Sequence, residues 1–124
     1  MNILVCDDDK EILEAITIYL QNEGYTVLKA ANGLEALQVL EENDIHLIIM
    51  DIMMPKLDGM RATVKIRENK NIPVIMLSAK SEDTDKIIGL NMGADDYIAK
   101  PFNPLELIAR VKSQLRRYTT LGSL

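Results

Sequence analysis

One short run in the middle of the chain limits the fold class more than any other feature. Residues 46–50 (HLIIM) have the length of a β-strand, without the alternation of a half-exposed one. This pattern is typical of a strand buried on both faces, as in a parallel sheet covered by helices. Asp51 follows the run directly, and Pro55 and Asp58-Gly59 then interrupt regular structure. An acid is therefore expected where a buried strand ends and a loop begins.

The rest of the chain repeats this alternation of a short apolar run and a helical segment. Strands are predicted over residues 2–6, 25–30, 73–77 and 96–99, and amphipathic spacing predicts helices over residues 10–23, around 34–40, and over 59–68, 82–92 and 104–117. Each helix is an adequate crossover between two parallel strands. Five consecutive strand–helix units predict an α/β fold, a flavodoxin-like (βα)5 sandwich with a doubly wound parallel sheet in the order 2-1-3-4-5.

The chain has 124 residues, which is enough for one ordinary domain and too few for two. We expect this domain over residues 1–118, and the start of a linker or a frayed end over 119–124. The net charge of −5 argues against direct nucleic-acid binding, so any DNA-binding domain is expected outside these residues. No apolar stretch approaches the roughly 18 residues of a membrane span. The single cysteine, Cys6, allows no intrachain disulfide, and together these features predict a cytoplasmic protein without a membrane partner.

Residues capable of chemistry stand at the ends of the predicted strands. They are Asp7 and Asp8 after the first strand, Asp51 after the third, Ser78 after the fourth and Lys100 after the fifth. Because the carboxyl ends of parallel strands share one edge, these side chains are expected to meet in one crevice. Crowded carboxylates repel one another, and a hard divalent cation such as Mg²⁺ would offset their charge. Such a site suits a phosphoryl group, which Asp51 could accept as a nucleophile to form an acyl phosphate.

Ordered motifs along almost the whole chain agree with this interpretation. They are Asp7-Asp8, Asp51 with Met54-Pro55 and Asp58-Gly59, Ser78-Ala79, Gly93-Ala94-Asp95-Asp96-Tyr97 and Lys100-Pro101-Phe102. Over about residues 2–118 this set resembles the receiver domain of bacterial two-component response regulators. The resemblance implies that Asp51 accepts a phosphoryl group from a histidine kinase. It also implies that the protein is no enzyme in the usual sense and catalyses only its own phosphotransfer and dephosphorylation.

The resemblance further implies a set of metal ligands around the acceptor. Asp8 would bind Mg²⁺ directly, and Asp7 would bind it mostly through water. Asp51 itself and the backbone carbonyl of Met53 would complete the protein ligands. Mn²⁺ could take the place of Mg²⁺.

Three residues beyond the metal ligands take roles from the same resemblance. Lys100 would pair with the phosphoryl oxygens, and its peptide bond to Pro101 would be cis. Ser78 would hydrogen-bond one phosphoryl oxygen and act as a switch. Tyr97 would be the aromatic residue that rotates with the switch.

The last third of the chain resembles the OmpR/PhoB class of response regulators, whose members carry a C-terminal winged-helix DNA-binding domain. Active receivers of this class dimerise through their fourth helix, fifth strand and fifth helix. The pairs that the resemblance implies between subunits are Lys86 with Glu106, Asp96 with Arg110 and Asp95 with Arg117, around apolar Ile87, Leu90 and Ala109. A two-fold interface would use each pair twice. The same charges could also form an ordinary solvated face.

Three other functions compete with this interpretation. An aspartate-nucleophile phosphatase would carry a second acid two residues after the nucleophile, but that position holds Met53. A stand-alone receiver that signals through contact with another protein would share the same acceptor site. A nucleotide or flavin binder is disfavoured, because the chain has no phosphate-binding glycine-rich loop.

Overall fold

A five-stranded parallel sheet forms the centre of the computed structural model, which describes residues 1–78 and 93–119. The strands are β1 (Asn2–Cys6), β2 (Thr26–Ala30), β3 (Leu47–Asp51), β4 (Val74–Ser78) and β5 (Asp96–Ala99). Their order in the sheet is β2-β1-β3-β4-β5, and every neighbouring pair is parallel. The predicted flavodoxin-like strand order is confirmed.

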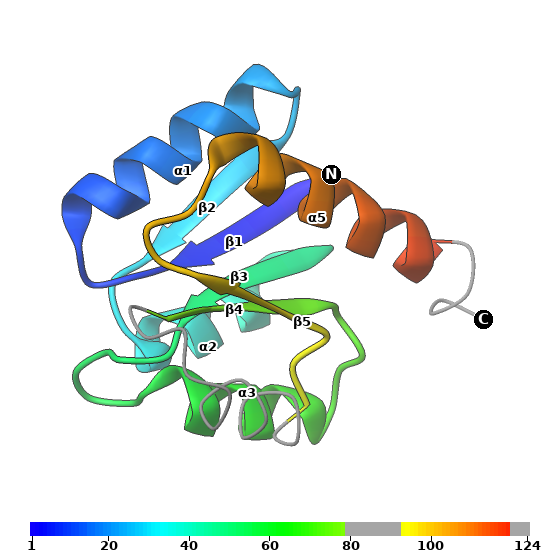
Figure 1. Ribbon diagram of the computed structural model, residues 1–124. Helices are drawn as coiled ribbons and strands as arrows, with labels where there is room; N and C mark the ends of the chain where they lie inside the picture. The colour runs from blue at the N-terminus through cyan, green and yellow to red at the C-terminus, as the bar shows by residue number, and fades with distance from the viewer. Residues whose placement is uncertain (79–92, 120–124) are drawn as a thin grey trace.

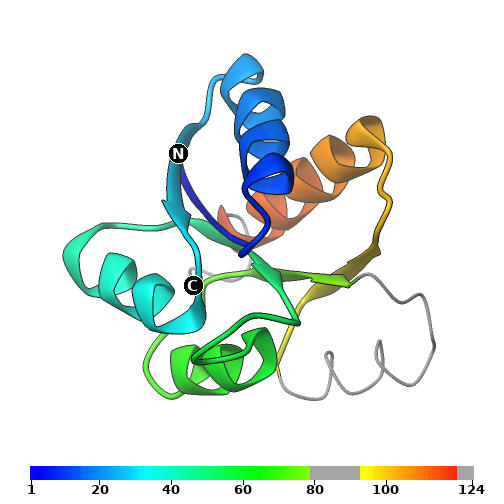
Figure 2. The same ribbon diagram turned by 90° about the vertical axis from the view of Figure 1, so that its left-hand side faces the viewer.

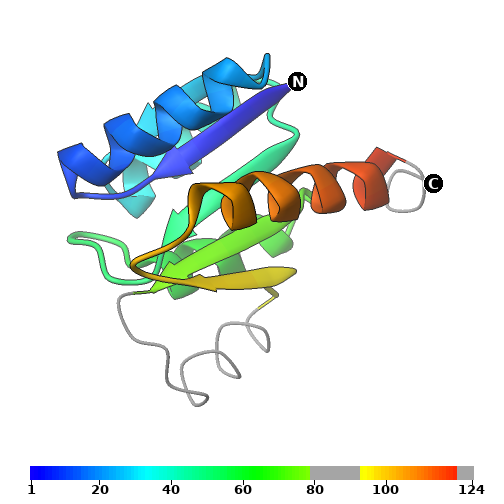
Figure 3. The same ribbon diagram turned by 45° about the horizontal axis from the view of Figure 1, so that its top comes forward.

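Helices cover both faces of this sheet (Figure 1). They are α1 (Lys10–Asn22), α2 (Gly33–Glu42), α3 (Gly59–Arg67) and α5 (Pro104–Arg117). Helices α1 and α5 lie across one face, as Figure 3 shows, and α2 and α3 cover the other. The helix predicted over residues 82–92 lies outside the described residues. None of the described helices has the length and apolar character that a membrane crossing requires.

The core consists of two apolar layers, one on each face of the sheet. Ile3 and Val5 of β1 pack in the layer beneath α1 and α5, whereas Leu4 and Cys6 pack in the layer above α2 and α3. All five residues of β3 are buried. A strand covered on both faces needs apolar side chains at successive positions, which explains the run without alternation in residues 46–50.

The ends of two strands differ from the prediction by one residue. Asp51 and Ser78 were expected to follow their strands, but they are the last residues of β3 and β4. The reason is that the sheet ladder continues one step further, with Asp51 opposite Leu77 and Ser78 opposite Ala99. The backbone of both polar residues is therefore held by the sheet and not by a loop.

Arg67, at the end of α3, contacts the segments that lead into β4 and β5, at the edge of the sheet where the strands begin. Its Nε donates to the carbonyl of Gly93 at 3.0 Å, and its guanidinium also bonds the Ile72 carbonyl and pairs with Asp95. The Asp95 carboxylate accepts a second hydrogen bond, from the backbone N–H of Val74 at 2.8 Å. One side chain thus ties α3 to the starts of β4 and β5.

We expect Arg67→Ala to lower the free energy of unfolding by about 2 kcal/mol, because two carbonyls and a carboxylate lose their charged donor. Urea denaturation would measure the change. Arg61→Ala is the matched control, since the Arg61 side chain on the same helix is 81% exposed. Equal stabilities of the two variants would show that the contacts of Arg67 contribute nothing specific.

Candidate functional site

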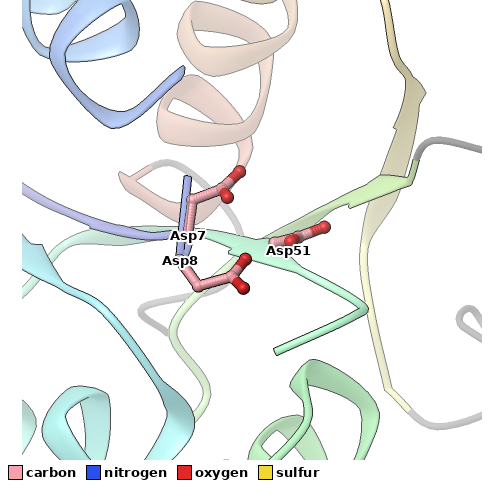
Figure 4. Close-up of side chains that lie close together, drawn as sticks. All are labelled: Asp7, Asp8 and Asp51. Carbon is pink, nitrogen blue, oxygen red and sulfur yellow. The ribbon is translucent and has the colours of Figure 1, made fainter. Parts of the chain in front are cut away.

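The carboxyl ends of the strands meet at one edge of the sheet, which faces the viewer in Figure 2. Strand β1 leads into Asp7 and Asp8, and the neighbouring strand β3 ends in Asp51. The three side chains extend from these adjacent strand ends in Figure 4. Carboxylate oxygens of all three lie within 4.8 Å of one another. The sequence-based expectation that these acids share one crevice is confirmed.

The three acids differ in their surroundings. Asp7 and Asp51 are buried, at 1% and 4% exposure, whereas Asp8 is exposed. Asp7 already accepts two hydrogen bonds, from the backbone N–H of Asp9 at 2.9 Å and from Lys100 Nζ at 2.9 Å. Asp8 is therefore the acid most open to a ligand from solvent, and Asp7 is the one most engaged within the protein.

Lys100 brings a positive charge into this cluster from the end of β5. Its Nζ lies 2.9 Å from Asp7 Oδ2 and 3.4 Å from Asp51 Oδ1, and its side chain is only 15% exposed. The peptide bond from Lys100 to Pro101 is cis, as expected. The backbone N–H of Lys100 donates to the carbonyl of Ser78 at 2.6 Å. The ends of β4 and β5 thus deliver Lys100 beside Asp51.

Burial raises the pKa of Asp51 to about 6, and the charge of Asp7 adds to this effect. Lys100 opposes the rise in pKa but does not cancel it. For Lys100, burial acts to lower the pKa, yet the hydrogen bond to Asp7 and the charge of Asp51 together raise it. At neutral pH Asp51 is therefore ionised, and its buried charge lowers the stability of the folded protein.

We expect Asp51→Asn to be more stable than the parent protein at pH 7.5 without metal, by about 2 to 3 kcal/mol. The folded protein binds a proton at Asp51 up to about pH 6, whereas the unfolded chain releases it near the ordinary pKa of 3.8. Ionisation of Asp51 therefore lowers the stability of the parent as the pH rises from about 4 to about 6. The Asp51→Asn variant lacks this contribution, because its amide does not ionise. Urea denaturation in the presence of a chelator would give both values. A stability difference that is the same at pH 4 and pH 7.5 would contradict this account of Asp51.

The two expected switch residues lie on the adjacent strands β4 and β5, and β4 is the neighbour of the strand that ends in Asp51. Ser78 is 3% exposed at the end of β4, and Tyr97 is 8% exposed within β5, opposite Met76. Tyr97 packs in the apolar layer that also contains residues of α2 and α3. Their roles as switch residues stay predictions.

Four of the charged residues expected at a dimer interface, Asp95, Asp96, Glu106 and Arg110, have ion-pair partners within the described part of the chain. Arg110 Nη1 lies 2.7 Å from Asp96 Oδ1, and Arg110 Nε lies 3.6 Å from Glu106 Oε1. Asp95 pairs with Arg67 and not with an exposed arginine of α5. Pairing of these acids between two subunits is untested and would have to replace or share the contacts within one chain.

The other members of this expected interface fall into two groups. Glu106, Ala109 and Arg117 lie exposed on α5. Lys86, Ile87 and Leu90 lie outside the described residues.

Gly59 also shapes the site, although the sequence suggested only an interruption of regular structure there. A Cβ atom at this position would lie 2.1 Å from the backbone oxygen of Asp51. The start of α3 therefore packs directly on the backbone of the acceptor. The only signal in the sequence was a glycine placed where the helix begins.

The donor set fits a magnesium ion. Mg²⁺ prefers oxygen ligands and usually takes one or two carboxylates together with water. Asp8 and Asp51 offer such oxygens within 4.8 Å of one another, and an oxygen of Asp7 lies within the same distance of both. With one ammonium against three carboxylates, the cluster has an excess of negative charge that a divalent cation would offset.

Residues 3–112 match the family model of the response regulator receiver domain. The chain is 52% identical over 116 residues to the regulatory protein VanRc of Enterococcus gallinarum. It is 50% identical over 115 residues to the transcriptional regulatory protein CpxR homolog of Haemophilus influenzae. These alignments cover 94% and 93% of this chain but 50% of each relative. The chain thus spans about half the length of the curated relatives it matches.

Solved structures show the same similarity in three dimensions. The receiver domain of the Francisella response regulator 1452 has a TM-score of 0.89 at 42% identity, over 94% of this chain and 97% of that one. The BeF3-activated N-terminal receiver domain of Klebsiella pneumoniae RstA has a TM-score of 0.90 at 33% identity, over 94% and 99% of the two chains.

Proposed function

The chain belongs to the response regulator receiver domain family, and on this premise we propose that Asp51 accepts a phosphoryl group from a histidine kinase. The observation that carries the proposal is the placement of Asp51 within 4.8 Å of two further acids and 3.4 Å from Lys100. A lone acid at a strand end could be a capping residue. An ionised carboxylate held among acids and an ammonium is a nucleophile beside charges that suit a phosphoryl group.

Asp51 acts in its ionised form. One carboxylate oxygen attacks phosphorus, the phosphorus–nitrogen bond of the phosphohistidine breaks, and the electron pair leaves with the imidazole. The product is a mixed anhydride between the carboxylate and the phosphate. Attack of water on its phosphorus returns the carboxylate and free phosphate. The protein thus catalyses only its own phosphorylation and dephosphorylation.

Some of the surrounding residues would bind the metal ion, and others would bind the phosphoryl oxygens. Mg²⁺, or Mn²⁺ in its place, would offset the negative charge of the transferred group when bound by Asp8, Asp51 and the carbonyl of Met53. Asp7 would reach the ion mostly through water, which agrees with the two hydrogen bonds it already accepts. Lys100 would pair with phosphoryl oxygens, and Ser78 would donate its hydroxyl hydrogen to one of them.

Intact mass measurement after incubation with acetyl phosphate would test acceptance directly. One added phosphoryl group in the presence of Mg²⁺, and none with a chelator, is the expected result. A steady-state assay with a generic phosphate ester separates this function from the aspartate-nucleophile phosphatase. Sustained turnover of that ester would favour the phosphatase.

Phosphorylation would act through β5, α5 and the helix predicted over residues 82–92, the last of which lies outside the described residues. Ser78 would move toward the phosphoryl oxygens and Tyr97 would turn into the vacated space, which would favour a second copy of the chain at this surface. Such a change can only follow from a difference in affinity for the phosphoryl group between the two states. Two relatives carry transcriptional or regulatory names and are about twice as long. An attached winged-helix domain of the OmpR/PhoB class would then be brought onto paired DNA half-sites; a stand-alone receiver is the alternative.

We expect Mg²⁺ with beryllofluoride to convert the protein from monomer to dimer at high micromolar concentration. Arg117→Glu should prevent dimerisation, because the new negative charge at this exposed position of α5 would repel the expected partner Asp95. Light scattering coupled to size exclusion would measure the mass. Lys10→Glu, with the same change of charge at an exposed position of α1, is the control and should dimerise. An unchanged mass of the parent protein would count against the dimer.

A further inference from the structure

The loop between β3 and α3, residues 52–58, runs beside the start of α2 (Figure 2). The backbone N–H of Gly33 donates to the carbonyl of Leu57 at 3.0 Å. Gly33 is the first residue of α2, so its N–H has no acceptor within its own helix. The loop therefore supplies a partner that the helix cannot.

This contact requires the absence of a side chain at residue 33. A Cβ atom on Gly33 would lie 2.3 Å from the carbonyl oxygen and 2.8 Å from the Cβ atom of Leu57. The backbone of Gly33 is not in the left-handed region, so its conformation alone would accept an alanine. What excludes the side chain is the closeness of the loop.

A second contact fixes the same junction from the end of β1. The thiol of Cys6 lies 3.3 Å from the carbonyl oxygen of Asn32 and 3.3 Å from Met54 Sδ. Cys6 directly precedes Asp7 and contacts Met54 of the loop. The end of β1 therefore connects the loop to the acids. Within the loop, Lys56 has a φ of 65°, a conformation that a residue with a side chain rarely adopts unless its surroundings hold it.

We propose that Gly33 is a positioning residue for the metal site. By holding the carbonyl of Leu57 against the start of α2, it fixes the loop that contains Met53, whose carbonyl is one of the three protein ligands of Mg²⁺ in the proposed function. The inference rests on that function, because a loop without a metal ligand would need no such precision. A side chain at residue 33 would push the loop away and move the Met53 carbonyl with it.

Calorimetric titration of the phosphate-free protein with Mg²⁺ tests the proposal. Gly33→Ala is expected to weaken Mg²⁺ binding about tenfold, the lower end of the effect of removing groups that orient metal ligands. Leu34→Ala is the matched control, since its side chain is 54% exposed on the next residue of α2, and it should bind as the parent does. Parent-like binding by Gly33→Ala would overturn the proposal, as would equal weakening in Leu34→Ala.

A measurement on the parent protein does not depend on how the variant folds. If the contact between the loop and Gly33 favours Mg²⁺ binding, then Mg²⁺ binding must favour that contact by the same free energy. Hydrogen exchange at the Gly33 amide should therefore slow on adding Mg²⁺, and more than exchange at Asn43, whose N–H bonds Val39 at the far end of α2. Equal slowing of both amides would contradict the coupling. Failure of the parent to bind Mg²⁺ at all would instead contradict the proposed function.

Discussion

Asp51→Asn is expected to abolish phosphorylation by acetyl phosphate, to the level of the buffer background. The amide has nearly the size of the carboxylate but lacks its charge and its nucleophilic oxygen. Asp51 is 4% exposed and its backbone is held at the end of β3, so we expect no other side chain to replace it as the acceptor. Intact mass measurement over time in saturating Mg²⁺ would follow the reaction.

Asp9→Asn is the matched control for this experiment. Asp9 directly follows Asp7 and Asp8 in the sequence, but its carboxylate accepts hydrogen bonds from the N–H groups of Glu11 and Ile12 as the N-cap of α1. Asparagine caps a helix about as well as aspartate, so this variant should be phosphorylated at the parent rate. Phosphorylation of Asp51→Asn at the rate of Asp9→Asn would identify a different acceptor.

Lys100→Met should cause the second large effect, on stability and on phosphorylation together. The variant leaves the fully buried carboxylate of Asp7 without its ion pair, at a cost of about 3 kcal/mol at neutral pH. It also removes the charge that holds down the pKa of Asp51, so the carboxyl should protonate at a higher pH. Acceptance of the phosphoryl group should fall because more of Asp51 is protonated and because the phosphoryl oxygens lose Lys100 as a partner.

A double-mutant cycle with Asp7→Asn separates the ion pair from other effects of losing Lys100. In the Asp7→Asn background, Lys100→Met should cost much less, because no unpaired charge is left at residue 7. Lys70→Met serves as the control for losing an exposed lysine, and it should change neither unfolding in urea nor phosphorylation. An equal cost of Lys100→Met in both backgrounds would show that the pair with Asp7 is not what stabilises this edge.

The sequence was sufficient for the fold and for the centre of the site because both depend on regular patterns. An apolar run without alternation requires cover on both faces, and parallel strands place Asp7, Asp51 and Lys100 at one edge whatever the details of the loops. The one-residue error at Asp51 and Ser78 arose because the ladder extends through polar residues that apolar patterns do not include.

Contacts between distant loops left no pattern in the sequence. The hydrogen bond from Gly33 to Leu57 and the clamp of Arg67 on Asp95 join segments whose spacing follows no helical or strand period. Charge alone could not tell whether Asp96 pairs with Arg110 within one chain or between two. The structure shows the pair within the chain at 2.7 Å, so an interface must compete with it.

Mapping the phosphorylated residue tests the central claim most directly. The protein would be treated with acetyl phosphate in Mg²⁺ or in chelator, the acyl phosphate trapped by borohydride reduction, and the peptides sequenced by mass spectrometry. We predict a single reduced residue, Asp51, that forms only with the metal present. Modification at Asp7 or Asp8 instead, or equal modification of Asp51 in chelator, would contradict the account of Asp51 as a metal-dependent phosphoryl acceptor.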